Sequence, residues 1–262
     1  MTSNKVLVDM DNRGVGTITL NHPEKHNVFD DAVICDLTEA LSALAARPEL
    51  RVLILASAGK TFCAGGDVSW MKRMARYTYE ENLKDAEILA TMLKTLNFFP
   101  RPTIARVQGA AFGGAVGLVA CCDIAVAAVE ASFALSEVKI GIIPAAISPY
   151  VIGAIGQRAA RRYFTTGERF SAETAAALGL VSDVVAEQRL DEKIGDFVEI
   201  LSANSPAAVT AAKKLVFNVA SREIDEALIQ YTSEEIAAIR VSEEGQEGLN
   251  AFLEKRIPAW RL

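Results

Sequence analysis

A glycine-rich run at residues 108–117, QGAAFGGAVG, constrains the fold of this chain more than any other part of its sequence. It follows a β-like stretch at 102–107 and leads into an apolar segment that ends at Asp123. This order predicts a strand, a tight turn and the first turn of a buried helix. A helix start carries unpaired N–H groups and partial positive charge, and glycine lets a ligand come close to the backbone.

A second turn of the same kind, FCAGGD at residues 62–67, follows another strand-like run at 52–57. Two turns that present backbone N–H groups could hold one developing oxyanion between them. That arrangement serves acyl chemistry, because it places donors where negative charge forms in the transition state.

The first part of the chain alternates strand and helix patterns, which predicts parallel strand pairing and an α/β class. From about Leu190 onward only helical patterns follow, so we expect an α/β core at 1–190 and a helical C-terminal subdomain at 191–262. The expected strands are 5–9, 16–20, 52–56, 103–107 and 124–128, and the expected helices are 30–46, 80–96, 192–203, 206–220, 224–240 and 242–254.

Composition narrows the function classes. A net charge of −6 and a pI near 5.2 argue against general affinity for nucleic acid or an anionic membrane. The first residues lack an apolar secretory segment, and the four cysteines form no CxxC pair, so we expect a cytoplasmic protein. Two histidines without other ligands at suitable spacing make a metal site unexpected.

Four segments in order resemble the enoyl-CoA hydratase/isomerase (crotonase) superfamily over nearly the whole chain. They are NHPEKHNVFD near the start, FCAGGD, IARVQGAAFGGAVGLVACCDI, and SEEGQEGLNAFLEKRIPAW near the end. The resemblance implies a crotonase-like spiral core of strand–helix repeats and a helical C-terminal trimerisation subdomain. It also implies an acyl-CoA substrate, no cofactor beyond the CoA moiety of that substrate, and a homotrimer or dimer of trimers.

The resemblance also implies a mechanism in which two backbone N–H groups bind the thioester oxygen. By position these donors are Ala64 and Gly114. The segment FALSEVKIGIIP corresponds to the one that carries a catalytic glutamate in this family, and Glu137 falls on it. Its apolar neighbours favour a raised pKa, which suits proton exchange beside a thioester. The alternative is an ordinary solvated carboxylate.

One position departs from the family pattern. Hydratases with two glutamates carry the other carboxylate three residues after the second N–H donor, where this chain has Gly117. Either Glu137 works alone or another residue substitutes. The favoured interpretation is a hydratase that adds water across an α,β double bond. The alternative is a double-bond isomerase in which Glu137 shuttles one proton.

The segment at 138–181 resembles hydratases of methylglutaconyl-CoA and related branched thioesters, whose substrates carry a second carboxylate. That carboxylate would need a cation or N–H donors, and the alternative is that the available cations are solvated surface charges. Trp70, Met71 and Met74 either line the acyl pocket or pack in the core. The candidate cations are Lys72, Arg73, Arg76 and Lys139.

For CoA itself, the family resemblance points to the opening loop, the first turn and a basic residue near the C-terminus. The expected substrate- and CoA-binding residues are Lys25, His26, Ala64, Gly65, Gly66, Asp67, Trp70, Met71, Gly117 and Lys255. Two other classes stay open. The basic cluster at 72–76 could belong to an RNA-binding or scaffold protein, which the acidic pI disfavours. The chain could also be a family relative with acyl or C–C lyase activity on CoA thioesters.

Overall fold

The computed structural model describes residues 5–261. Its main sheet has six strands in the order β1-β2-β3-β4-β6-β9; β1 and β2 form an antiparallel hairpin, and the other pairs are parallel. The expected α/β class is confirmed. The strands of this sheet are β1 Val6–Met10, β2 Val15–Leu20, β3 Val52–Ser57, β4 Thr103–Val107, β6 Ile124–Ala128 and β9 Asp183–Val185.

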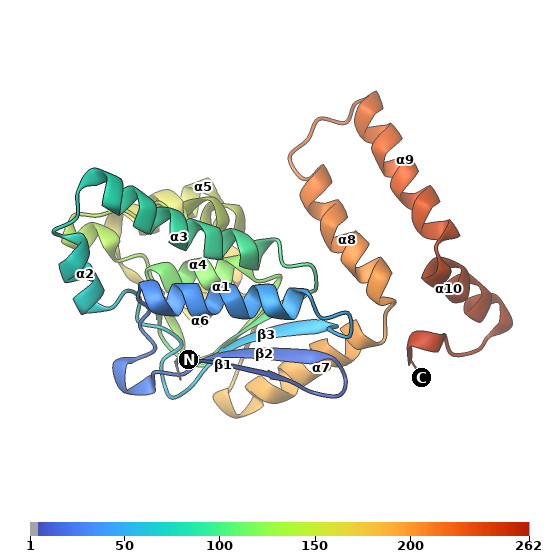
Figure 1. Ribbon diagram of the computed structural model, residues 1–262, viewed down its shortest axis with the longest axis horizontal. Coiled ribbons are helices and arrows are strands. Elements are labelled where there is room, and N and C mark those ends of the chain that lie inside the picture. Colours follow the sequence, from blue (N-terminus) through green and yellow to red (C-terminus); the bar gives the residue numbers. More distant parts are fainter. Residues whose placement is uncertain (1–4, 262) are drawn as a thin grey trace.

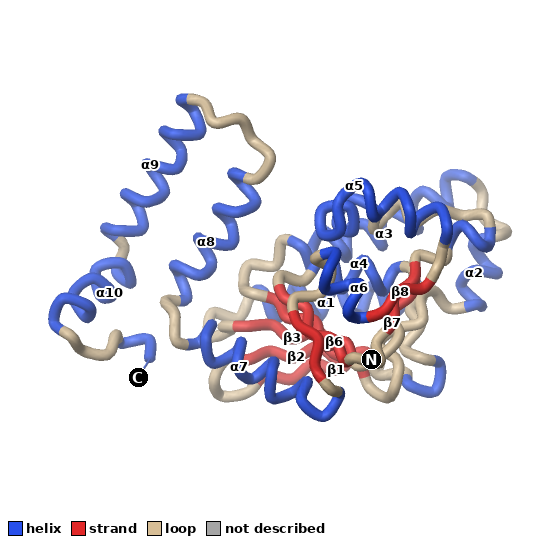
Figure 2. The backbone as a smooth tube through the Cα atoms, turned by 180° about the vertical axis from the view of Figure 1, so that it is seen from behind, coloured by secondary structure: helices blue, strands red, loops and turns tan. Residues whose placement is uncertain are grey.

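A second, smaller sheet has the order β5-β7-β8, and the sequence patterns do not predict it. Its strands are two or three residues long, which is too short for an alternating pattern to show: β5 Ala111–Phe112, β7 Ser132–Ala134 and β8 Arg169–Ser171. Figure 2 shows β7 and β8 beside α6 Ala172–Leu178, apart from the main sheet. This small sheet adjoins the glycine-rich run, because β5 is part of it.

Helices cover both faces of the main sheet. Because side chains alternate along a strand, Leu53 joins the larger core cluster while its neighbour Val52 joins a second cluster on the other face. Strand β3 is therefore buried on both faces. The remaining helices of the α/β body are α1 Asp31–Ala45, α2 Val68–Met74, α3 Tyr79–Asn97, α4 Gly114–Cys121, α5 Ser148–Thr166 and α7 Leu190–Ser202, with 3-10 turns η1 Pro23–Lys25, η2 Glu137–Ile140 and η3 Glu187–Arg189.

The boundary expected after residue 190 falls too early. Helix α7 buries Leu190, Ile194 and Val198 against the second face of the sheet, so it is part of the core. The helices that extend away from the α/β body begin at α8 (Figure 1). They are α8 Pro206–Val219, α9 Glu226–Val241 and α10 Glu243–Glu254, followed by η4 Ala259–Arg261. Among residues 5–261, no helix is long and apolar enough to cross a bilayer.

Polar contacts join α8 to the core around Asp123, the acidic residue that closes the glycine-rich segment. Its Oδ2 accepts hydrogen bonds from the backbone N and Oγ1 of Thr103 at 2.7 and 2.9 Å. The same oxygen lies 2.6 Å from Nζ of Lys213 on α8, which also donates to the Arg101 carbonyl at 3.0 Å. The role of Asp123 is therefore structural, because its contacts tie β4, β6 and α8 together.

Nearby arginines serve the same junction. Arg51 donates to the carbonyls of Ser202 and Asn204 at 3.0 and 2.9 Å. Arg101 donates to the Leu50 carbonyl at 2.8 Å and to Thr210 Oγ1 at 2.6 Å. A cavity of about 650 Å³ at this junction is lined by both arginines, and it lies at the other end of the strands from the two glycine turns. Because these guanidinium groups hold the chain together, we assign the cavity no part in the chemistry.

We predict that Lys213→Met lowers the free energy of unfolding by about 1–3 kcal/mol, because it removes a charged donor from the partly buried Asp123 carboxylate. Lys214→Met, on the exposed side of the same helix, is the matched control. Urea denaturation of both variants measures the difference. Equal stabilities for the two variants would contradict the structural role of Asp123.

Candidate active site

The two glycine turns lie side by side. Cys63 donates its backbone N–H to the Ala110 carbonyl at 3.0 Å, and Phe112 donates to the Cys63 carbonyl at 3.0 Å. These bonds make an isolated parallel bridge between Cys63 and Ala111. The turn after β3 and the turn after β4 thus meet at the carboxyl ends of neighbouring parallel strands, where α/β sheets commonly bind ligands.

Gly114 begins α4 and presents its N–H at the helix start. The preceding residue, Gly113, has φ 56° and ψ −126°, a conformation that favours glycine, and it donates its N–H to the Ala134 carbonyl at 2.8 Å. Gly114 has no preceding helical turn to donate to, and no hydrogen bond of its N–H is found within residues 5–261. The sequence prediction of an open donor at Gly114 therefore agrees with the geometry.

The first turn differs from the expectation. The N–H of Ala64, the predicted partner donor, is already bonded to the His26 carbonyl at 3.0 Å. Gly65 N lies 3.4 Å from Cys63 Sγ, and Asp67 donates to the Phe29 carbonyl at 2.9 Å. Among residues 64–67 of the described chain, only the Gly66 N–H has no acceptor. Ala64 is therefore the wrong donor, and Gly66 is the residue whose N–H is open.

Glu137, the predicted acid/base residue, lies against the second turn. A Cβ atom placed on Gly113 would be 3.2 Å from Glu137 Oε1, so the carboxyl group packs directly beside the residue that precedes Gly114. Its Oε2 is buried and has no hydrogen-bond partner within the described chain. Burial raises the pKa of the Glu137 carboxyl, and a hydrogen bond from its own backbone N–H offsets only part of that effect.

No carboxylate could be accommodated at Gly117 in this packing. Gly117 is buried in α4, and a Cβ atom there would lie 2.2 Å from Cγ2 of Ile147 and 3.4 Å from Cδ2 of Leu93. The sequence analysis placed Gly117 among the substrate-binding residues. That expectation is wrong, because Ile147, which is 2% exposed, fills the space beside Gly117.

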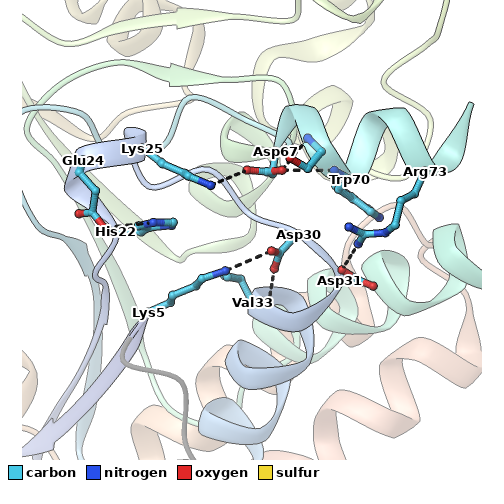
Figure 3. Close-up of polar contacts among 11 residues, drawn as sticks. Lys5, His22, Glu24, Lys25, Asp30, Asp31, Val33, Asp67, Trp70 and Arg73 are labelled. Carbon is cyan, nitrogen blue, oxygen red and sulfur yellow. Dashed lines mark hydrogen bonds and ion pairs between the residues drawn. The ribbon is translucent and has the colours of Figure 1, made fainter.

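The rest of the first turn has structural partners. Asp67 caps α2: its Oδ1 accepts from the N–H groups of Ser69 and Trp70 at 2.7 and 3.2 Å, and its Oδ2 lies 3.7 Å from Lys25 Nζ (Figure 3). Lys25 and Asp67 were both predicted to contact CoA. The structure brings them together at the surface, with about half of the Lys25 side chain exposed.

The sequence left open whether the apolar side chains of α2 line the acyl pocket or pack in the core, and Trp70 packs in the core. Its side chain is 5% exposed, and its indole N–H donates to Asp85 Oδ1 at 3.0 Å. Met71 instead lies against the first turn. Its Cε is 3.2 Å from the point where a Cβ atom on Gly66 would stand, so it contacts the residue with the open N–H. Met74 is partly buried and packs against the main core.

The opening loop packs on the first turn. His26 Nδ1 lies 3.1 Å from Thr61 Oγ1, and His26 also supplies the carbonyl bonded to Ala64. The buried amide of Asn27 donates to the carbonyls of Ala58 and Thr61 at 2.7 and 2.8 Å. These contacts fix the loop that carries Lys25 and His26 beside the predicted CoA side of the site.

The candidate cations for a second carboxylate are scattered. Arg73 forms an ion pair with Asp31 (Figure 3). Lys72 and Arg76 are exposed, and Arg76 lies beyond the end of α2 at Met74. Lys139 lies in η2, beside the backbone of Gly167.

Lys255 lies far from the two turns. It is the C-cap of α10, at the end of the helices that extend away from the core (Figure 1), so it does not reach the site of its own chain.

Comparison with known proteins places this site in a family. Residues 10–262 match the sequence profile described as enoyl-CoA hydratase/isomerase. A crystal structure titled as an enoyl-CoA hydratase from Shewanella pealeana superposes with a TM-score of 0.95 at 46% identity and covers 98% of this chain and 96% of its own. High structural similarity with that protein agrees with the predicted crotonase fold.

Two curated relatives extend the comparison. A protein of Mycobacterium bovis named "Probable enoyl-CoA hydratase echA8" is 34% identical over 259 residues, 98% of each chain. The (E)-benzylidenesuccinyl-CoA hydratase of Thauera aromatica is 31% identical over 249 residues, covering 94% of this chain and 95% of its own. This chain, an enzyme of the hydratase type, therefore belongs to the enoyl-CoA hydratase/isomerase family.

Proposed function

We propose that this enzyme adds water across the α,β double bond of an acyl-CoA thioester, with Glu137 as acid and base. The observation that carries this proposal is the placement of the partly buried Glu137 carboxyl, whose Oε2 is fully buried, beside Gly113 and next to the open N–H of Gly114. A carboxylate with a raised pKa exchanges protons more readily near neutral pH than an ordinary one.

In the first step, the Gly66 and Gly114 N–H groups bind the thioester oxygen. Ionised Glu137 takes a proton from water as the water oxygen bonds to the β-carbon. The electron pair of the double bond moves toward the thioester, where the two donors stabilise the enolate oxygen. Glu137 then gives its proton to the α-carbon and returns to the ionised state. The elements of one water molecule are added, and the enzyme is unchanged.

The packing of Ile147 against Gly117 supports a mechanism with one carboxylate, because it leaves no room for a second one on α4. A site with a single carboxylate also fits a second candidate function, a double-bond isomerase. In that reaction Glu137 removes the α-proton of a 3-enoyl thioester and returns it to the γ-carbon. Between these, the hydratase is favoured by the names of the relatives, including one from Mycobacterium bovis and one from Thauera aromatica.

Methylglutaconyl-CoA or another enoyl-CoA is the substrate that we propose. The relative from Thauera aromatica supports a branched substrate with a second carboxylate, since benzylidenesuccinyl-CoA is a substituted succinyl thioester. For the CoA portion, we assign Lys25 and His26 of the opening loop and Gly65 of the first turn. As part of the same proposal, the enzyme works in the cytoplasm, where its four free cysteines would stay reduced.

Lys255 takes part only if a neighbouring chain brings it to the site. Helices α9 and α10 expose large apolar side chains, with Phe252 at 81%, Val241 at 78% and Leu253 at 75% exposure. Exposed apolar surface of this kind marks an interaction face. We propose a homotrimer or a dimer of trimers in which these helices pack on neighbouring subunits and present Lys255 to the CoA of a partner.

We predict that crotonyl-CoA or methylglutaconyl-CoA loses its conjugated ultraviolet band when mixed with the enzyme, because hydration removes the double bond. A 3-enoyl-CoA should gain no such band. If neither conjugated substrate changes while the 3-enoyl substrate gains the band, the enzyme is an isomerase and the hydratase proposal is wrong.

Glu137→Gln should lower kcat/KM by about 10²–10⁴-fold, because the amide cannot accept or return the proton. Glu130→Gln, at an exposed position between β6 and β7, is the control and should keep full activity. Initial rates with the substrate identified above measure both variants. Unchanged activity in Glu137→Gln would rule out every mechanism based on this carboxyl.

The raised pKa of Glu137 also predicts a pH-dependent stability difference. A carboxyl with a folded-state pKa above its unfolded value destabilises the folded protein when ionised, and this penalty disappears as the pH falls through the folded pKa. Glu137→Gln should therefore melt at a higher temperature than the unsubstituted protein at pH 7, and the gap should narrow toward pH 4. A gap that stays constant over this range would contradict the burial of an ionised group.

Sedimentation equilibrium should give three or six times the 28.1 kDa chain mass. Lys255→Met should raise the KM for acyl-CoA without changing the assembly, since a methionine keeps the length of the side chain but not its charge. A monomer in solution would contradict the proposed role of α9 and α10, and an unchanged KM would contradict that of Lys255.

A further inference from the structure

The backbone of Phe29 forms hydrogen bonds with the residues on both sides of Gly66, whose N–H is the open donor of the first turn. Phe29 donates its N–H to the Gly65 carbonyl at 3.0 Å, and its own carbonyl accepts from the Asp67 N–H at 2.9 Å. These two bonds make an isolated parallel bridge between Phe29 and Gly66. The peptide groups on both sides of Gly66 are therefore tied to one residue of the opening segment, and the Gly66 N–H cannot shift without it.

The side chain of the same residue reaches the second donor. A Cβ atom on Gly114 would lie 2.4 Å from Cζ of Phe29 and 3.3 to 3.4 Å from the two Cε atoms, so the tip of the ring packs on the Gly114 backbone. The ring is 3% exposed. Phe29 thus touches both halves of the oxyanion site, with its backbone on one and its ring on the other.

The ring is supported from behind. The Trp70 ring centroid lies 6.2 Å from that of Phe29 at an interplanar angle of 55°. Trp70 is in turn fixed by its hydrogen bond to Asp85 on α3 and by its place in the first turn of α2, which Asp67 caps (Figure 3). A ring that is packed on both sides holds a fixed position, as an aromatic side chain in a close-packed interior does.

We propose that Phe29 is a positioning residue that sets the separation between the N–H groups of Gly66 and Gly114. It acts through these two donors and needs no contact with the substrate. The inference rests on the proposed function, since it assumes that both donors bind one thioester oxygen. Glycine at position 114 follows from the same contact, because any Cβ atom there would collide with the ring.

The test uses a spectroscopic signal that reports the oxyanion site at equilibrium. Donors on the carbonyl of a conjugated thioester polarise it and shift its absorption to longer wavelength. Cinnamoyl-CoA bound to the Glu137→Gln protein, which does not turn it over, is the reference. Phe29→Leu, Gly114→Ala and the double variant are made in this background. Phe99→Leu, a change at another fully buried phenylalanine on the chain between α3 and β4, is the matched control.

We expect Phe29→Leu and Gly114→Ala each to reduce the red shift of bound cinnamoyl-CoA. The first leaves the ring's space empty, and the second forces the ring and the turn apart. The double variant should recover more of the shift than Gly114→Ala alone, because the shorter side chain makes room for the new methyl group. With Glu137 present, Phe29→Leu should lower kcat about ten- to hundred-fold while KM changes little. Phe99→Leu should lose stability but keep the shift.

A red shift in Phe29→Leu equal to that in Phe99→Leu would overturn the inference. So would a double variant that is no better than Gly114→Ala, a comparison that decides even if Phe29→Leu alone does not fold. If the reference protein itself binds cinnamoyl-CoA without any red shift, the failure lies in the proposed oxyanion site.

Discussion

The site depends on one short backbone pairing. Two hydrogen bonds, from Cys63 to Ala110 and from Phe112 to Cys63, hold the turns after β3 and β4 side by side. The parallel sheet brings the strand ends to one edge, and this bridge joins the two turns directly. Because both donors are main-chain groups, the position of the backbone, more than the identity of any side chain, determines whether an oxyanion can bind.

Burial determines the chemistry at this edge. Within residues 5–261 the Oε2 of Glu137 has no hydrogen-bond partner, which costs stability in the ionised state and makes the carboxyl suitable for proton transfer. Ile147, at the start of α5, fills the space beside Gly117 of α4, where the family pattern has a second carboxylate. The remaining helices α8 to α10 are joined to the core by the contacts of Asp123 and Lys213 and contribute nothing to the site of their own chain.

Apolar periodicity predicted five of the six strands of the main sheet and most of the long helices, and the glycine spacing located both turns, whereas β9 and α5 were not predicted. The errors share one cause: they concern contacts between residues distant in sequence. Ala64 was assigned as a donor from its position in the family motif, and nothing local shows that the His26 carbonyl, 38 residues earlier in the sequence, occupies its N–H. Gly117 was expected to bind the substrate, and nothing local shows that Ile147, 30 residues later, fills the space beside it. Phe29 carried no signal beyond an aromatic residue in the opening loop.

The central claim is that Gly66, Gly114 and Glu137 surround one thioester. A crystal structure with a bound saturated acyl-CoA, which cannot be hydrated, tests it most directly. We predict that the thioester oxygen lies within about 3.2 Å of the backbone nitrogens of Gly66 and Gly114, with the Glu137 carboxyl facing the α- and β-carbons. A thioester oxygen bound to the Ala64 N–H, or a Glu137 side chain that turns away from the acyl group, would contradict the account.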